Sequence, residues 1–367
     1  MKKLRYGIVG LGGIAKYKHI PGYKPFDGTD VEFVAACDIL PEKEAFAKES
    51  GFKKFFTDYK ELLKEDLDYI SVCTPNYLHA PITIEALNSG KHVHCEKPMA
   101  MSGEEADAML AAAKANKKIL MVALNNRFTP ATQFVKQYVD EGNLGEIYFA
   151  KCGWVRRAGS ANSGWFTDKK QSGGGPIIDL GVHFIDLVMY FMNYPDLASA
   201  HARTYAKLHN QPKGYLYSYN RQPKPEGFTY SVEDFSTGML EFKNDASLVF
   251  EISWASNIEK EFTYYDLYGT QGGLRFYNDF QSDPRNGIRI FKIINDQHCD
   301  ITPNISSAAT PNTDSGISET TTEFGHFLNS VVTGNQPTIS IPEQGPKMIK
   351  IIDAIYKSAN EKRQILL

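Results

Sequence analysis

The chain has 367 residues, more than one hydrophobic core usually organises, so we expect two domains. Its 42% hydrophobic and 23% charged residues are typical of a globular protein and exclude a disordered or fibrous chain. A net charge of -3 lacks the basic excess that nucleic acids or anionic membranes attract. The five cysteines form no C-x-x-C pair, which predicts reduced thiols. With no cleavable signal peptide or apolar span expected, the sequence predicts a cytoplasmic protein without membrane or nucleic-acid partners.

Strand and helix patterns alternate over residues 1–125, as in a doubly wound parallel sheet. Because both faces of such a sheet are covered, its strands read as nearly continuous apolar runs. The expected strands are 4–10, 31–38, 67–75, 92–98 and 118–125, and the expected helices are 41–50, 81–90 and 102–117. We therefore predict an α/β Rossmann domain over 1–125.

From residue 126 onward, strand patterns follow one another, and several alternate apolar and polar residues. Helices at 176–194 and 342–362 would cover one face of the resulting sheet. The prediction for 126–367 is an α+β domain with a large open-faced, mainly antiparallel sheet, for substrate binding and oligomerisation. Its C-terminal helix is free to pack back on the Rossmann domain. The expected strands are 145–154, 236–244, 246–256, 262–277 and 287–294, and 207–227 and 302–322 are long loops.

A glycine pattern, "GIVGLGGIA", places Gly10, Gly12 and Ala15 directly after the first strand and before a helix. The glycines allow a tight turn and a close approach of the backbone to a pyrophosphate at the helix N-terminus. Asp38 ends the next strand, where a carboxylate accepts hydrogen bonds from ribose hydroxyls and repels a 2′-phosphate. This predicts NAD in preference to NADP. The alternative for Asp38 is an N-cap of the following helix.

A second cluster, "HVHCEKPMA", leads from a buried strand into Glu96 and Lys97. Ligands lie at the carboxyl ends of strands in such sheets, and partial burial lowers a lysine pKa from about 10.4. The alternative is a surface lysine in a turn. His92 and His94 share one face of the strand, but no acid or cysteine cluster accompanies them, so we predict no metal site.

A polar stripe runs through the apolar stretch "GGGPIIDLGVHFIDLVMYFM", where Asp179, His183 and Asp186 fall at i, i+4 and i+7. Pro176 suits the first helical turn after the three glycines. Asp186 either holds the imidazole of His183 in one tautomer or satisfies a buried backbone group.

Four motifs in order, "GIVGLGGIA", "CTPNYLHAP", "EKPMA" and "SGGGPIIDLGVHFIDL", resemble those of the Gfo/Idh/MocA oxidoreductase family, and the resemblance extends over essentially the whole chain. It implies a nicotinamide cofactor, a sugar, cyclitol or related polyol substrate, and a homodimer or homotetramer formed through the C-terminal sheet. The catalytic residues that it implies are Lys97, Asp179 and His183. The predicted cofactor-binding residues are Gly10, Leu11, Gly12, Gly13, Ile14, Ala15, Asp38, Thr74, Pro75, Asn76, His79, Glu96 and Lys97.

Oxidation of a secondary alcohol needs a base for the hydroxyl proton and a group that stabilises the developing negative charge. His183 is the preferred base, because its unperturbed pKa lies near 6.5. Asp179 would orient it or bind a hydroxyl, and Lys97 would donate to the reacting oxygen. Lys97 as the base remains open. Candidate substrate-binding residues are Asn125, Arg127, Arg157, Trp165, Asp179 and His183, although ordinary surface arginines and a core tryptophan would read the same way.

The function predicted from the sequence is NAD-dependent hydride transfer between the nicotinamide and a secondary alcohol of a sugar, cyclitol or related polyol. Two alternatives stay open. One is an NAD-dependent glycosidase that works by transient oxidation and elimination, and the other is a non-catalytic dinucleotide-binding regulator. The segment 205–230 is longer than the family pattern, and its role is left open.

Overall fold

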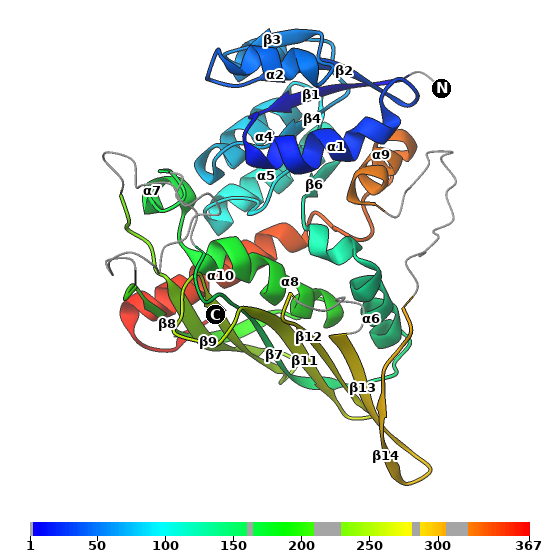
Figure 1. Ribbon diagram of the computed structural model, residues 1–367, viewed down its shortest axis with the longest axis vertical. Helices are drawn as coiled ribbons and strands as arrows, with labels where there is room; N and C mark the ends of the chain where they lie inside the picture. The colour runs from blue at the N-terminus through cyan, green and yellow to red at the C-terminus, as the bar shows by residue number, and fades with distance from the viewer. Residues whose placement is uncertain (1–2, 160–163, 209–228, 281–286, 306–321) are drawn as a thin grey trace. The chain divides into compact units, whose positions relative to one another are not determined.

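The computed structural model describes residues 3–159, 164–208, 229–280, 287–305 and 322–367 (Figure 1). The chain divides into two compact units. The first runs to Phe128 and takes in a second segment that ends at Ile349, and the second begins at Thr129 and includes Lys350–Leu367. The sequence-based division at residue 126 allowed the C-terminal helix to pack back on the Rossmann domain but did not assign the segment before that helix to the first unit.

The first unit contains a six-stranded sheet in the order β3-β2-β1-β4-β5-β6, and all its strand pairs are parallel. This is the order of a Rossmann fold, so the predicted doubly wound sheet is confirmed. The strands are β1 (Leu4–Val9), β2 (Val31–Cys37), β3 (Lys54–Phe56), β4 (Tyr69–Val72), β5 (His92–Cys95) and β6 (Leu120–Val122). The helices are α1 (Ile20–Tyr23), α2 (Lys43–Glu49), α3 (Tyr59–Leu63), α4 (His79–Asn88), α5 (Gly103–Asn116) and α9 (Glu323–Thr333).

An aromatic core fixes α9 to the Rossmann sheet. Tyr6 of β1 stacks on Tyr69 of β4 with ring centroids 4.9 Å apart, and Phe327 of α9 meets Tyr69 edge to face at 5.5 Å. Phe327 and Leu328 are fully buried in the same cluster. Because the buried face of α9 closes the core of the first unit, this late segment is part of the Rossmann unit rather than an appendage.

The second unit contains a nine-stranded sheet in the order β14-β13-β12-β11-β7-β10-β9-β8-β15. Its neighbouring strands are antiparallel except for β7 and β10, which confirms the predicted mainly antiparallel sheet. The strands are β7 (Ile147–Val155), β8 (Leu197–Tyr205), β9 (Phe235–Phe242), β10 (Ser247–Ser253), β11 (Phe262–Gly269), β12 (Gly273–Asn278), β13 (Ile288–Ile294), β14 (Gln297–Ile301) and β15 (Ile365–Leu366). The helices are α6 (Pro130–Asp140), α7 (Lys169–Ser172) and α8 (Val182–Phe191), and α10 (Gln344–Glu361) crosses from the first unit into the second.

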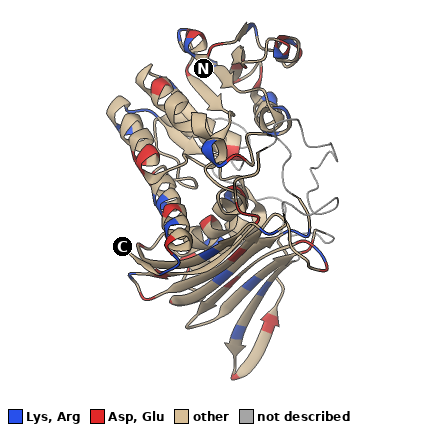
Figure 2. Cartoon of the chain, turned by 90° about the vertical axis from the view of Figure 1, so that its left-hand side faces the viewer, with Lys and Arg blue, Asp and Glu red and all other residues tan. Residues whose placement is uncertain are grey.

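The two faces of this sheet differ. Ala150 and Cys152 of β7 are fully buried on the face that α8 covers. The other face carries Phe149 and Lys151, which alternate with these two residues along β7. Phe149 pairs there with Tyr268 of β11. Figure 2 shows basic residues on several strands of this sheet. The outer face therefore combines aromatic and charged side chains.

By length and composition alone, Lys169–Phe191 could cross a membrane, which corrects the expectation that no segment would qualify. In the structure, 94% of its apolar window is buried inside the protein, as in the core helix of a soluble protein. The segment comprises α7, a π-helical turn η5 (Ile177–Gly181) and α8. Its apolar character follows from packing between the sheet and neighbouring helices.

The placement of α9 predicts a selective loss of stability on truncation of its buried face. Leu328→Ala should lower the free energy of unfolding by about 2–5 kcal/mol, because it leaves a cavity in the aromatic core. Val332 of the same helix is 39% exposed, so Val332→Ala should change the free energy of unfolding by less than about 0.5 kcal/mol. Equal effects of the two variants in urea denaturation would contradict this placement.

Candidate functional site

The glycine turn after β1 has one glycine that the fold requires and two that leave open space. Gly10 has φ +92°, and a Cβ there would lie 2.5 Å from the carbonyl oxygen of Cys73. A Cβ at Gly12 or Gly13 would meet no atom within 4 Å. Ala15 is fully buried where the helix begins to pack. The unfilled space beside Gly12 and Gly13, at the N-terminus of a helix, suits a pyrophosphate, which must approach backbone N–H groups closely.

Asp38, directly after β2, is hydrogen-bonded to the backbone of this turn. Its Oδ2 accepts a hydrogen bond from the backbone N–H of Leu11 at 2.7 Å, and its Oδ1 accepts one from Leu40 at 3.0 Å. Helix α2 begins at Lys43 with Glu42 at its cap position, so Asp38 does not cap it. The carboxylate therefore lies beside the glycine turn, where a ribose-binding acid is expected.

The segment after β4 is joined to the segment after β5 by His79. The Nε2 of His79 lies 2.9 Å from the carbonyl oxygen of Thr74, and its Nδ1 lies 2.7 Å from that of Pro98. Burial lowers the pKa of His79, while its hydrogen bonds to the two backbone carbonyls oppose that shift. These contacts give His79 a structural role, and the cofactor contact predicted for it stays a prediction. Asn76 is buried nearby in sequence, at the start of a 3-10 turn.

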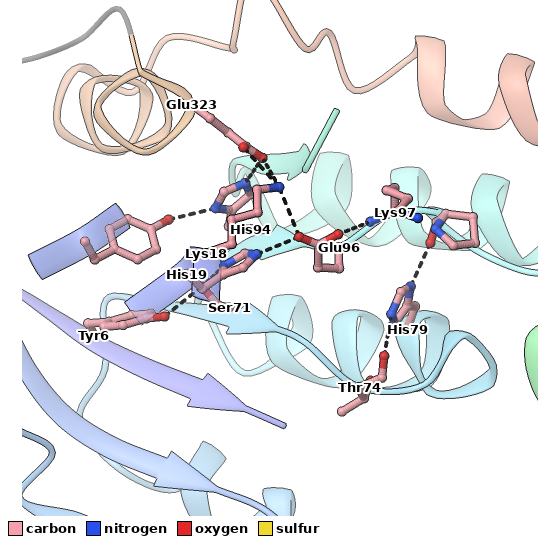
Figure 3. Close-up of polar contacts among 12 residues, drawn as sticks. Tyr6, Lys18, His19, Ser71, Thr74, His79, His94, Glu96, Lys97 and Glu323 are labelled. Carbon is pink, nitrogen blue, oxygen red and sulfur yellow. Dashed lines mark hydrogen bonds and ion pairs between the residues drawn. The ribbon is translucent and has the colours of Figure 1, made fainter. Parts of the chain in front are cut away.

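Glu96, at the end of β5, is a buried carboxylate with three donors (Figure 3). Its Oε1 accepts from Lys18 Nζ at 3.1 Å and from His19 Nε2 at 3.0 Å, and its Oε2 accepts the backbone N–H of Lys97 at 3.0 Å. Burial alone would raise the pKa of Glu96, but Lys18 and His19 hold it well below its usual value. The ionised carboxylate thus links the helix after the glycine turn to Lys97.

The ammonium group of Lys18 also forms an ion pair with Glu323, in the first turn of α9 (Figure 3). Lys18 Nζ lies 3.1 Å from Glu323 Oε2, and His94 Nε2 lies 3.2 Å from Glu323 Oε1. Burial lowers the pKa of His94 to about 4, so its Nε2–H donates to Glu323 while Tyr23 donates to its Nδ1 at 2.8 Å. His94 is therefore a structural side chain. Among the residues that the structure describes, no cluster of three metal-ligating side chains occurs.

Lys97 is half-buried and precedes a cis peptide bond to Pro98. It follows β5, Thr74 follows β4, and Gly10 follows β1, and these three strands are neighbours in the sheet. Because the carboxyl ends of parallel strands meet at one edge, the first unit gathers the predicted cofactor-binding segments there. Sequence reasoning missed Lys18 and Glu323, since 305 positions separate them and no local pattern marks either one.

The second unit holds the polar stripe. Asp179 lies in η5, and its Oδ2 accepts a hydrogen bond from Trp254 Nε1 at 2.9 Å. His183 is buried in the first turn of α8, with its ring centroid 6.1 Å from that of Trp154. Asp186, one turn further, is buried and accepts a hydrogen bond from the hydroxyl of Tyr194. Trp254 and Trp154 were not predicted as part of this site.

Two glycines of the run before the stripe, Gly174 and Gly175, leave no room for a side chain. A Cβ at Gly174 would overlap the hydroxyl of Tyr356, and one at Gly175 would overlap the carbonyl of Glu233. The Glu233 Oε1 accepts from the N–H of Gly175 at 3.1 Å, from that of Ile177 at 3.3 Å and from Tyr356 at 2.8 Å. A buried carboxylate therefore binds the N-terminal N–H groups of the helix that carries the stripe.

The remaining predicted substrate residues have different environments. Arg127 is fully buried and donates to Ile339 O at 2.8 Å and Gln344 Oε1 at 2.5 Å, so it braces the returning segment. Arg157 donates to Glu259 O at 2.9 Å. Trp165 is half-buried and Asn125 is exposed.

Comparisons with known proteins agree with this architecture. Residues 4–124 match a family model described as an oxidoreductase family with an NAD-binding Rossmann fold, and residues 136–367 match the C-terminal alpha/beta domain of the same family. The chain is 32% identical to D-glucoside 3-dehydrogenase of Escherichia coli (strain K12) over 99% of this chain and 97% of that protein. It is 30% identical to levoglucosan dehydrogenase of Pseudarthrobacter phenanthrenivorans over 75% of this chain and 74% of that protein.

Solved structures show the same fold. The chain superposes on a levoglucosan dehydrogenase in complex with NADH and L-sorbose with a TM-score of 0.82 at 25% identity, over 100% of this chain and 99% of that one. An aldose-aldose oxidoreductase from Caulobacter crescentus matches with a TM-score of 0.77 at 22% identity, over 100% of both chains. The chain therefore belongs to the Gfo/Idh/MocA oxidoreductase family and is an NAD-dependent oxidoreductase.

Proposed function

We propose that this enzyme is a sugar dehydrogenase that oxidises a secondary hydroxyl of a glycoside, with the C3 hydroxyl of a D-glucoside as its substrate position. The observation that carries the proposal is the similarity to D-glucoside 3-dehydrogenase over nearly the full length of both chains. The presence of Lys97, Asp179 and His183 supports the catalytic function, because a regulator without catalysis would have no need of all three.

The residues divide the work of alcohol oxidation between them. Bound NAD supplies the hydride acceptor. His183 takes the hydroxyl proton, since a neutral imidazole is an effective base near pH 7. Lys97 donates a charged hydrogen bond to the oxygen as negative charge develops on it. Asp179 binds a neighbouring hydroxyl or orients the imidazole. Among the candidate substrate-binding residues, Trp165 offers an aromatic face for a pyranose ring.

A substrate screen tests this function. Methyl α- and β-D-glucosides, free glucose, levoglucosan and inositol would each be incubated with NAD while NADH absorbance is followed. The proposal expects the glucosides to give the highest kcat/KM and a 3-keto product by NMR. Release of the aglycone without net NADH would select the glycosidase alternative. Turnover of inositol alone would overturn the choice of a glucoside.

The proposed catalytic roles predict a loss of chemistry without loss of cofactor. Lys97→Met and His183→Ala should each lower kcat by about 10²–10⁴-fold, while the affinity for NADH stays within a few-fold. The surface variants Lys114→Met and His298→Ala serve as matched controls and should keep wild-type turnover. If His183 is the base, the residual activity of His183→Ala loses the acidic limb of the pH profile, whereas Lys97→Met retains it. A near-normal kcat in either variant removes that residue from the mechanism.

The position of Asp38 predicts a preference for NADH over NADPH. Its carboxylate would repel a 2′-phosphate, and the adjacent Ile39 is 80% exposed and offers no positive charge. Asp38→Asn keeps an acceptor for the N–H of Leu11 but removes the negative charge. The dissociation constant of NADPH divided by that of NADH should therefore fall by about tenfold. Asp140→Asn, which changes an exposed carboxylate in α6, is the control. An unchanged ratio in a fluorescence titration would refute this role of Asp38.

The open face of the large sheet supports a proposed homodimer or homotetramer. Met239, Tyr277 and Phe291 are 38%, 42% and 37% exposed on this face, and Tyr264 pairs with Tyr277 across β11 and β12. Arg275 forms an ion pair with Asp266 on the same face, at 2.7 Å. Exposed apolar side chains interspersed with charge pairs are typical of surfaces that bind a second copy of the same chain.

A single charge should therefore weaken the assembly. Met239→Arg would place a cation in the apolar part of this face, and sedimentation velocity should show a shift toward monomer at micromolar concentration. Val332→Arg, at a 39% exposed position of α9, should leave the sedimentation coefficient unchanged. A monomeric wild-type protein, or an oligomer that Met239→Arg leaves intact, would contradict assembly through this face.

A further inference from the structure

We propose that Trp254 is a positioning residue for Asp179, holding its carboxyl group in one orientation through the indole N–H. The inference rests on the proposed function, because it assigns Trp254 a part in catalysis only through Asp179. No sequence motif singles out Trp254, which follows β10 in the segment "FEISWAS".

Burial and two contacts fix the indole. Trp254 is fully buried, its backbone N–H donates to the carbonyl of Asp234 at 3.0 Å, and its ring stacks on Phe166 with centroids 5.5 Å apart and planes 30° apart. With the ring held in this way, its Nε1–H points at Asp179 Oδ2, 2.9 Å away. The donor is therefore preorganised rather than recruited by the carboxylate.

The acceptor is fixed from the same corner of the sheet. Glu233, the neighbour of Asp234, binds the N–H groups of Gly175 and Ile177, which begin the helical segment that carries Asp179. Two consecutive residues thus set the position of both partners: Asp234 holds the tryptophan backbone, and Glu233 holds the start of the segment with the carboxylate. Small shifts of either partner are opposed by buried hydrogen bonds.

The chemistry of the pair gives the contact its consequence. An indole nitrogen donates but cannot accept, and its hydrogen bond to an ionised carboxylate is stronger than one to the carbonyl oxygen of a protonated acid. One oxygen of Asp179 is thereby occupied, and the carboxylate plane is restrained relative to His183, one turn later on the same segment. An acid restrained in this way presents its second oxygen in a constant direction, which is what orientation of a base or a substrate hydroxyl requires.

A double-mutant cycle separates positioning from general structural support. Trp254→Phe keeps a buried aromatic ring but removes the donor, and it should lower kcat for the glucoside by about tenfold with little change in NADH affinity. In an Asp179→Asn background the same substitution should have little further effect. Equal losses in both backgrounds, or no loss in either, would overturn the proposal.

NMR of the indole groups supplies a readout that needs no turnover and no folded Trp254→Phe variant. The chain has three tryptophans, so wild-type protein labelled with 15N should give three indole resonances. Asp179→Asn should shift the Trp254 resonance, while the Trp154 resonance, whose Nε1 donates to Glu261 at 2.8 Å, stays in place. An unmoved Trp254 resonance would refute the contact. If this shift is seen but Asp179→Asn leaves glucoside turnover intact, the contact stands and the proposed catalytic function fails.

Discussion

The partly buried ion pair between Lys18 and Glu96 is the interaction on which the cofactor-binding unit of this enzyme depends. Lys18 follows the glycine turn, Glu96 directly follows β5, and Glu323 begins α9, so the ammonium group of Lys18 joins three segments that are distant in sequence. Burial of a carboxylate without a partner costs several kcal/mol, so neither acid would remain ionised there alone. Because Glu96 also accepts the backbone N–H of Lys97, the position of this lysine follows from the ion pair.

In the second unit, uncharged donors stabilise a buried carboxylate. Glu233 is buried beside the glycine run, and backbone N–H groups and the hydroxyl of Tyr356 take the place that Lys18 occupies in the first unit. Burial raises the pKa of Glu233, whereas its hydrogen bonds oppose that rise. In both units a buried carboxylate fixes the segment that carries a candidate catalytic side chain. The functional residues are thus held by polar contacts placed inside otherwise apolar cores.

Sequence patterns predicted the two sheets and the strand ends that carry Gly10, Asp38 and Lys97, because periodicity and local turn chemistry determine these features. They did not predict α9 in the first unit, since its contacts depend on a return of the chain after most of the second unit. Arg127 illustrates a different limit. Its position after β6 suggested a ligand, but a strand end does not determine side-chain direction, and the guanidinium turns to Ile339 O instead. Glu323 and Trp254 escaped notice for the related reason that their partners are far away in sequence.

Isotope transfer is the sharpest test of the proposed hydride transfer from C3 of a glucoside to NAD. Methyl D-glucoside carrying deuterium at C3 would be oxidised by the purified enzyme, and the NADH formed would be analysed by mass spectrometry. We expect NADH that carries the deuterium, together with a slower turnover than that of the unlabelled glucoside. NADH without deuterium would place the oxidation at another carbon, and the absence of any NADH would contradict the dehydrogenase function itself.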